Sequence, residues 1–418
     1  MKKSLNLVLL FLLLTSCSKS SESIVDPGRF DKQNTYVVEG KVKNVNGEEI
    51  LPFNTQMNLT TYSDKVYEKL TPIYDKEIKR LHILFDRYNE YKDENGKIIN
   101  NLKIINDSYG KDKEIIVDQD LFNILEMSIE LAKLTNGNFN PTMGYLIDGW
   151  SSYFSPFNTI DAPNLEFTIE NEKEIIKRCE SIIPYDKLNE VIELDKKKLS
   201  VKFNKYSNIE KSIISLGAIG KGYAIDYMRR EFSKHDTPLI ISGSASSSYI
   251  QGKNPNPDRD KWNVQVNSPY KELVFNVPLL MSELEPGKVL STSGDYEQLF
   301  YYVNGDNIIR RHHILDPNKG YSNDYYRSIV LYCDTRSDIL DGLSTALFNI
   351  ENIEDVLTTI ENVEDYYDIK IDYLLQKEVS DRVVDLYFND GFKNTISEYY
   401  GTKQDINGIV RVKLWNII

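Results

Sequence analysis

The chain has 418 residues, of which 41% are hydrophobic and 11% aromatic, and this content is enough for a sizeable buried core. Its net charge of −13 argues against nucleic acid as a partner, because binding to a phosphate backbone needs an excess of Lys and Arg. With three cysteines, four histidines and no Cys-x-x-Cys pair, the sequence does not support a zinc or redox site built from Cys and His.

The first 16 residues have the pattern of a bacterial lipoprotein signal peptide. Two lysines are followed by an apolar run, Leu7–Leu14, of about eight residues, whereas a membrane-spanning helix needs roughly 20. Small residues then precede Cys17, and cleavage before this cysteine would leave it as a lipidated N-terminus. The alternative is an ordinary secreted protein in which Cys17 is incidental.

The rest of the chain divides into three parts. Residues 17–49 are rich in Ser, Asp, Asn and Lys, and they predict a tether that holds the folded part at an extracytoplasmic membrane surface. Residues 50–393 are expected to form the functional domain, although composition does not decide between one large domain and two. Residues 394–418 form a C-terminal extension whose role the sequence does not indicate.

Hydrophobic spacing predicts both strands and helices in this domain. Residues 53–62 alternate as in a strand, helical spacing follows from Thr71 to Tyr88, and a second helix is expected over residues 120–134, capped by Gly137. Helices are also expected after Gly220 and after Arg336, and further strands over residues 239–241, 262–266, 275–279, 299–303 and 328–332. Mixed elements without strict alternation favour an α+β fold.

A glycine-rich segment, residues 215–226, precedes one of the expected helices. Its three glycines, Gly217, Gly220 and Gly222, would let backbone N–H groups approach a phosphate at a helix N-terminus. The segment matches neither the P-loop pattern nor the dinucleotide-binding fingerprint. Taken alone, it is also compatible with a purely structural corner.

Three further motifs contain oxygen or imidazole groups. Asp341 and Thr345 are four residues apart, which places two hard oxygen ligands on one face of a helix, although an ordinary helix has such pairs too. His313 precedes Asp316 in a His-Ile-Leu-Asp-Pro turn, where a histidine is either a general base or a structural residue. Residues 290–296 form a hydroxyl-rich segment that suits a ribityl chain or phosphate, or is simply a polar turn.

The order of these motifs resembles that of the ApbE-type FAD:protein FMN transferases, from about Phe53 to Gly391. The matching blocks are TNGNFNPTMGYLIDGW (135–150), LGAIGKGYAID (216–226), STSGDYEQLFY (291–301), HILDPNKGY (313–321) and DGLSTALF (341–348). The resemblance implies an α+β fold of mixed sheets flanked by helices, related to the T-fold. It also implies that FAD lies in a cleft with Mg²⁺ on its pyrophosphate.

The resemblance assigns roles to individual residues. Mg²⁺ would be bound by the side chains of Asp341 and Thr345 and by the Ala218 carbonyl. His313 would be the base that activates the acceptor hydroxyl, and Asp316 would buttress its loop. The flavin or its phosphates would be contacted by the following residues: Met57, Met143, Gly144, Tyr145, Lys221, Asp226, Ser291, Thr292, Ser293 and Gly294. For Lys221 and Asp226 the alternative role is to hold the start of the helix.

In the implied reaction, a Ser or Thr hydroxyl of an acceptor redox protein attacks the FMN-side phosphorus of FAD, and AMP leaves. Family members usually have Asp where this chain has Ser215 and Asn140, so metal affinity or base strength could differ here. Two other functions fit the same motifs. One is an FAD pyrophosphatase, in which water replaces the acceptor, and the other is a flavin-binding lipoprotein without turnover.

Overall fold

The computed structural model describes residues 25–26, 33–38, 40–155, 157–244, 246–270, 278–380, 382–406 and 409–414. The predicted signal peptide, the lipidation residue Cys17 and a large part of the predicted tether lie outside these ranges. Within them, no helix combines the length and the apolar character that crossing a membrane requires.

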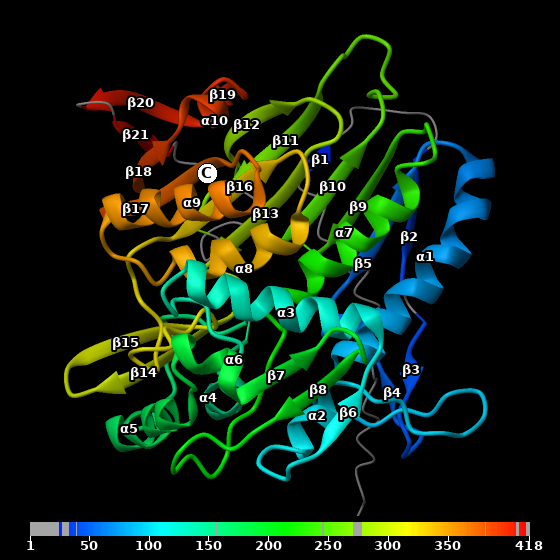
Figure 1. The fold of residues 1–418 in the computed structure, drawn as a ribbon. Coiled ribbons are helices and arrows are strands. Elements are labelled where there is room, and N and C mark those ends of the chain that lie inside the picture. Colours follow the sequence, from blue (N-terminus) through cyan, green and yellow to red (C-terminus); the bar gives the residue numbers. More distant parts are fainter. Residues whose placement is uncertain are drawn as a thin grey trace, which may run out of the picture.

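A ten-stranded sheet forms the centre of the fold (Figure 1). All its neighbouring strands pair antiparallel. In order across the sheet they are β2 (Asn34–Val37), β5 (Met57–Thr61), β9 (Leu239–Gly243), β10 (Ser247–Gln251), β13 (Val289–Gly294), β16 (Ser328–Cys333), β17 (Asp372–Ser380), β18 (Val383–Phe388), β21 (Ile409–Leu414) and β20 (Gly401–Ile406).

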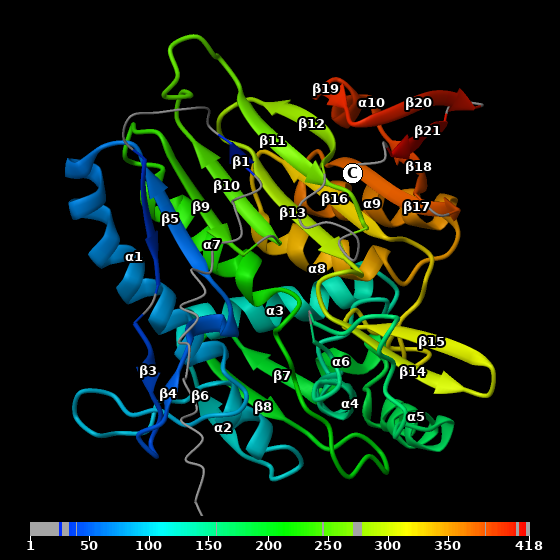
Figure 2. The same ribbon diagram turned by 180° about the vertical axis from the view of Figure 1, so that it is seen from behind.

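Helices cover one face of this sheet and a second sheet covers the other (Figures 1 and 2). The helices are α1 (Asp64–Phe85), α3 (Gln119–Leu134), α7 (Gly220–Phe232), α8 (Ser337–Leu347) and α9 (Ile353–Tyr367). The second sheet consists of β1 (Val25–Asp26), β11 (Trp262–Asn267), β12 (Pro278–Leu284) and β19 (Ile396–Tyr399). Alternation along the strands creates both cores: Ile241 packs on the helix side, whereas Ile240 packs against the second sheet.

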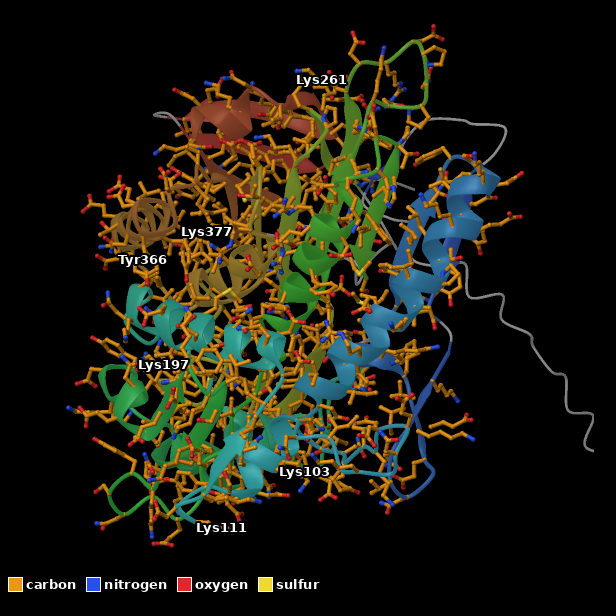
Figure 3. All side chains as sticks on the ribbon, turned by 45° about the vertical axis from the view of Figure 1, so that its right-hand side comes forward. Lys103, Lys111, Lys197, Lys261, Tyr366 and Lys377 are labelled. Carbon is orange, nitrogen blue, oxygen red and sulfur yellow. The ribbon has the colours of Figure 1, made fainter. Side chains whose placement is uncertain are left out.

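The remaining elements form a smaller region beside α3 (Figure 1). They are β3 (Val42–Lys43), β4 (Glu49–Ile50), α2 (Leu102–Asp107), β6 (Glu114–Ile116), α4 (Gly144–Trp150), α5 (Ile169–Ile176), α6 (Leu188–Val191), β7 (Ile192–Asp195), β8 (Ser200–Phe203), β14 (Leu299–Asn304) and β15 (Asn307–His312). The hairpin β14–β15 packs on α4 and α5 through a separate aromatic core that includes Trp150, Phe167 and Phe300. Figure 3 shows charged side chains such as Lys111 and Lys197 at the periphery, where both are exposed.

The expected α+β class is confirmed, and most expected elements are present. Helix α1 begins at Asp64, before the predicted Thr71, and ends at Phe85, so Tyr88 lies outside it and is 54% exposed. Gly137 has the predicted left-handed conformation, with φ of +80°. Of the strand predicted over residues 275–279, residues 275–277 lie outside the described part, and β12 begins at Pro278.

The C-terminal extension is part of the same folded unit. Strand β19 joins the second sheet, and the hairpin β20–β21 joins the ten-stranded sheet through β18. The short helix α10 (Asp390–Lys393) precedes these strands, and its Phe392 packs in the same core as Val412. The described part of the extension therefore has a structural role.

The cysteines Cys179 and Cys333 are both free thiols.

Candidate active site

The glycine-rich turn and the predicted metal ligand meet where α7 crosses α8. A Cβ atom at Gly222 would lie 2.3 Å from the carbonyl oxygen of Ser337 and 2.6 Å from the Cβ of Asp341, so only glycine permits this crossing. The Gly222 N–H donates to Asp341 Oδ2 at 2.9 Å. The carboxylate thus lies at the N-terminal end of α7, where the partial positive charge of the helix stabilises it.

The same hydrogen bond affects the carbonyl of Ala218. In a regular helix the N–H of Gly222 would bond the carbonyl four residues earlier, which is that of Ala218. Because this N–H donates to Asp341 instead, the Ala218 carbonyl lacks its helical partner. The Lys221 Nζ lies 3.8 Å from Asp341 Oδ2 and donates to the Gly217 carbonyl at 3.3 Å. A cation, a carboxylate and an available carbonyl are therefore close together.

Hydroxyl groups lie between α8 and β13. The Ser344 Oγ is 2.7 Å from the Ser293 Oγ and 3.2 Å from the Ser291 Oγ, and Thr345 Oγ1 donates to the Asp341 carbonyl at 3.1 Å. Ser291 is buried, whereas Thr292 and Ser293 are half-buried. Gly294 ends β13 against the Tyr296 ring, and a Cβ atom at this glycine would lie 2.6 Å from that ring. Side chains alternate along β13, so Thr292 points away from α8 and lines a cavity on the second-sheet side with Val264 and Tyr332. Thr292 therefore does not face the Asp341 region, and the accessible hydroxyls that do are those of Ser293 and Thr345.

The two consecutive histidines have different environments. His312 is fully buried; its Nε2 donates to the Asn323 carbonyl at 2.8 Å, and its Nδ1 accepts the Ile314 N–H at 3.3 Å. Burial therefore holds the His312 pKa well below its ordinary value. His312 fixes the loop, so His313 is the histidine of this pair that a substrate could reach.

His313 is exposed, and its backbone N–H donates to the Gln298 carbonyl at 3.2 Å. Loss of hydration next to the surrounding protein lowers the His313 pKa, and the nearby Lys221 ammonium lowers it further. Solvent at the exposed ring moderates the lowering of this pKa.

Asp316 organises the loop after His313. Its Oδ1 accepts the Asn318 N–H at 2.7 Å, its Oδ2 accepts from Asn323 Nδ2 at 2.8 Å, and its carbonyl accepts the Gly320 N–H at 2.8 Å. The side chain is buried. These contacts make Asp316 a positioning residue rather than a group that reaches a substrate.

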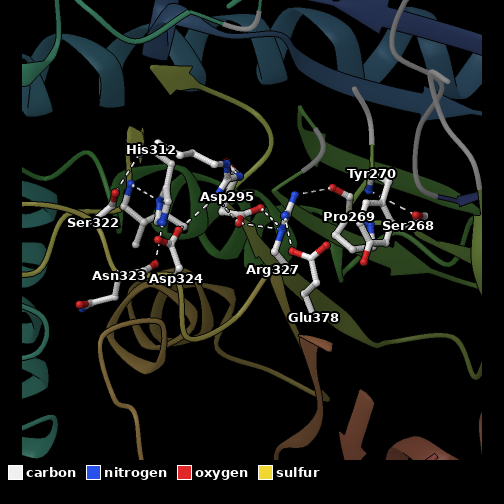
Figure 4. A network of polar contacts seen from close by, with 12 residues as sticks. Ser268, Pro269, Tyr270, Asp295, His312, Ser322, Asn323, Asp324, Arg327 and Glu378 are labelled. Atoms are coloured by element: carbon white, nitrogen blue, oxygen red, sulfur yellow. Dashed lines mark hydrogen bonds and ion pairs between the residues drawn. The ribbon is translucent and has the colours of Figure 1, made fainter. Parts of the chain in front are cut away.

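A buried ion network joins the end of β13 to the histidine hairpin (Figure 4). The carboxylate of Asp295 is fully buried, with Arg310 Nη1 at 2.8 Å and Arg327 Nε at 2.9 Å from its Oδ2. Burial raises the Asp295 pKa, and the two guanidinium groups oppose that rise. Arg310 is three residues before His313, so the network sets where the hairpin lies relative to β13. No local motif in the sequence predicts this network.

The predicted flavin contacts near residue 144 lie beside a groove. Gly144 N–H donates to the Ile213 carbonyl at 2.8 Å, and Met143 forms an isolated bridge with Ile213. The Tyr145 ring has Lys211 Nζ 4.2 Å and the Arg178 guanidinium 4.6 Å from its centroid. The groove has a volume of about 350 Å³ and is lined by Arg87, Tyr88, Lys103, Asn106, Asp107, Tyr109, Asp148, Glu210, Lys211, Ser212 and Ile213.

Met57 and Asp226, like Ser291, are predicted contact residues that do not reach an open surface. Met57 is fully buried against Gly243, where an added Cβ atom would lie 3.2 Å from the Met57 Sδ. Asp226 is buried on α7 and pairs with Arg229 Nε at 2.9 Å and Arg230 Nε at 3.2 Å. In this structure both residues support the elements around the site.

Asn140 and Ser215 stand where members of the resembled family usually have Asp, and the structure gives them different contacts. The Asn140 Nδ2 donates to the Ile183 carbonyl at 2.8 Å, and its Oδ1 accepts the Thr142 N–H at 2.9 Å. A carboxylate could not make the first of these bonds. The Ser215 N–H donates to the Pro141 carbonyl at 2.8 Å, which ties the glycine-rich turn to the Asn140 loop.

The oxygen atoms around Asp341 suit a magnesium ion that shares its coordination with a phosphate. In the part of the chain that the structure describes, no three His, Cys, Asp or Glu residues are grouped to hold a metal. The available donors are the Asp341 carboxylate, the Thr345 hydroxyl and the free Ala218 carbonyl. Mg²⁺ typically combines one or two carboxylates with water and substrate phosphates, so this set fits it.

These features define an α+β protein in which helix α7 begins at a glycine-rich turn, beside the carboxylate of Asp341. The ApbE family model matches residues 53–368, and the chain belongs to the ApbE family. It is 26% identical over 248 residues to an FAD:protein FMN transferase of Treponema pallidum, a match that covers 56% of this chain and 60% of that protein. A second FAD:protein FMN transferase, from Haemophilus influenzae, is 22% identical over 291 residues, covering 70% of this chain and 74% of that protein.

Solved structures show the same fold. The ApbE protein of Thermotoga maritima superposes with a TM-score of 0.61 at 20% identity, covering 88% of this chain and 100% of that one. The flavin transferase ApbE from Vibrio cholerae gives a TM-score of 0.61 at 17% identity, covering 87% and 99%. At these sequence identities the structural likeness shows the fold of this chain but not its activity.

Proposed function

We propose that this chain transfers FMN from FAD to a Ser or Thr hydroxyl of an extracytoplasmic acceptor protein, with Mg²⁺ bound and with release of AMP. Membership of the ApbE family and the names of the relatives support this activity. The observation that best supports the site is the contact of Gly222 and Lys221 with Asp341. The ion pair between Arg310 and Asp295 holds the hairpin that precedes His313 at the end of β13.

The metal would be held by Asp341, Thr345 and the Ala218 carbonyl. When bound, Mg²⁺ would neutralise charge on the pyrophosphate and polarise the phosphorus. Lys221 and the N-terminus of α7 would attract the anionic diphosphate. The half-buried hydroxyl of Ser293, next to Ser344 on α8, would hydrogen-bond the ribityl chain or phosphate oxygens.

His313 would act as general base. Its lowered pKa keeps the imidazole neutral at neutral pH, so it can accept the hydroxyl proton of the acceptor. The hydroxyl oxygen then bonds the FMN-side phosphorus, the bond from that phosphorus to the bridging oxygen breaks, and AMP leaves with that oxygen. His312 and Asp316 would hold the loop in place during this exchange.

A membrane location follows from the N-terminal pattern. We infer that Cys17 is lipidated and anchors the protein on the extracytoplasmic side. Labelling of cells with an acyl-chain analogue should mark the full chain but not its Cys17→Ser variant. A wild-type chain without label would contradict this location.

The function can be tested with the full chain, FAD and Mg²⁺, by chromatography of AMP and FMN with and without an acceptor protein. The proposal predicts that AMP release depends on the acceptor and that little free FMN accumulates. Equal amounts of AMP and free FMN, independent of the acceptor, would indicate a pyrophosphatase. Bound FAD without either product would indicate a carrier and contradict both enzymatic functions.

A further inference from the structure

The loop segments 151–155 and 157–168 contain the two most exposed large hydrophobic side chains in the described part of the chain. Phe157 is 85% exposed and Leu165 is 79% exposed. Ile160 on the same loop and Ile308 on β15 are also exposed. Isolated exposed apolar residues are ordinary, whereas several in one segment indicate an interaction surface.

Hydrogen bonds hold this loop against the base of the β14–β15 hairpin. Ser155 and Leu299 bond each other through both backbone N–H groups, at 3.1 and 3.3 Å, and Asn158 Nδ2 donates to the Leu299 carbonyl at 2.7 Å. The Phe157 N–H donates to the Ser155 Oγ at 3.2 Å. Phe157 is therefore an exposed aromatic residue on an anchored backbone, which lowers the entropy lost when a partner covers it.

The anchor point is adjacent to the proposed base. Leu299 pairs with His312 in the hairpin, and the preceding residue, Gln298, accepts the backbone N–H of His313. Phe157 is thus linked to His313 through Ser155, Leu299 and Gln298. A polypeptide that covers Phe157 would bring its own side chains to the entrance of the site.

The apolar residues follow the hairpin from its base toward its tip. The Asn164 N–H donates to the Tyr301 carbonyl at 2.8 Å, which places Leu165 further along β14 than Phe157. Val303 pairs with Ile308 near the tip. Because a strand advances about 3.3 Å per residue, the stretch from Leu299 to Val303 spans roughly 13 Å. This length suits a segment of a folded partner protein.

Charge favours a protein over a membrane as the occupant. Residues 151–168 include Asp161 and Glu166 and contain no Lys or Arg. Binding to anionic lipid headgroups relies on clusters of basic residues. An acidic apolar loop lacks that attraction.

We propose that Phe157, Ile160, Leu165 and Ile308 form the docking surface for the acceptor protein whose hydroxyl receives FMN. This assignment rests on the proposed FMN transfer, and it adds the place where the macromolecular substrate binds. Phe157 and Leu165 supply the apolar area, and the anchored backbone next to His313 sets the direction of approach.

The test compares the full chain with its Phe157→Ser/Leu165→Ser variant, using a purified acceptor protein with one Ser or Thr flavinylation site. The variant should raise the KM for the acceptor at least about tenfold, as expected for the loss of buried aromatic and aliphatic area. The kcat at saturating acceptor and the KM for FAD should stay within about twofold. Ile116→Ser is the matched control, because Ile116 is 66% exposed on β6, in the three-stranded sheet. An unchanged acceptor KM, or an equal rise in the control, would overturn the proposal.

Measuring acceptor binding directly tests the docking surface independently of FMN transfer. If the wild-type chain transfers no FMN, the proposed function fails, and acceptor binding measured by biolayer interferometry still tests the surface. Weaker binding in the double variant alone would support the docking surface. If the double variant binds the acceptor as the wild type does but no longer binds phosphatidylcholine–phosphatidylglycerol vesicles, the surface contacts a membrane and the docking proposal is overturned.

Discussion

The N–H of Gly222 and the carboxylate of Asp341 form a 2.9 Å hydrogen bond that joins α7 to α8 at the site. The bond exists because Gly222 lets the helices approach to a distance that a side chain would prevent. It places the carboxylate beside Lys221 and leaves the Ala218 carbonyl available. The arrangement of the proposed metal ligands therefore depends on one glycine.

Gly222→Ala should separate the two helices, because its Cβ would overlap the Ser337 carbonyl and Asp341. We expect a loss of roughly 1–3 kcal/mol in the free energy of unfolding and at least about a tenfold loss of AMP release. Gly217→Ala is the control within the same turn, since its nearest neighbour would be the Ser215 Oγ at 3.7 Å. Equal effects of the two substitutions in chemical denaturation and turnover assays would contradict this explanation.

Asp341→Asn should abolish most turnover while the fold is kept. The Asn oxygen can still accept the Gly222 N–H, but the negative charge for the metal is lost. We expect turnover to fall at least about 100-fold and to recover in part at high Mg²⁺. The control is Asp338→Asn on the same helix, where Asp338 pairs with Arg336 Nε at 2.9 Å. Unchanged AMP release by Asp341→Asn over a Mg²⁺ titration would refute the metal site.

The pH dependence of turnover should reflect His313. A base works only when neutral, so activity is lost as pH falls through the His313 pKa, which lies below 6.5. Lys221 lowers this pKa and Glu297 raises it, so Lys221→Met should move the acidic limb to higher pH and Glu297→Gln to lower pH. His313→Gln should remove the limb. A His313→Gln profile with the wild-type acidic limb would show that another group is titrating.

Asp295→Asn should impair both folding and catalysis. It would leave Arg310 and Arg327 without their shared carboxylate, which typically costs about 3–5 kcal/mol for a buried pair. It should also lower kcat, because Arg310 precedes His313 on the hairpin. Asp385→Asn is the control, since Asp385 binds Arg411 at 2.6 and 2.7 Å on β18 and β21. That variant should lose stability with kcat intact, and an equal kcat loss would remove the positioning role of Asp295.

The sequence predicts the elements that have a strong local signal. The helix over residues 120–134 and its cap at Gly137 have clear periodicity and a residue suited to positive φ. The predicted start of α1 is too late, since the helix begins at Asp64 and includes Pro72 in its interior. The hairpins β17–β18 and β20–β21 are not predicted, although the strands of each are consecutive in the sequence. Strand β19 is not predicted either, and its partner β12 is distant in the sequence.

The site is predicted in part for a similar reason. Asp341, Thr345, Lys221 and His313 belong to motifs that are short in sequence, and the structure brings them toward one region. Ser344 lies within one such motif, yet its contact with Ser293 depends on how α8 packs on β13. Local spacing also cannot reveal that Met57 is buried, or that Asp295 binds arginines from two other segments.

The most direct measurement is intact mass spectrometry of an acceptor protein incubated with the full chain, FAD and Mg²⁺. The account predicts that the acceptor gains the mass of one FMN with one AMP released, that a Ser/Thr→Ala acceptor gains none, and that EDTA blocks both changes. An unmodified acceptor together with free FMN and AMP would contradict transfer, and so would a mass gain that persists in Asp341→Asn at the wild-type rate.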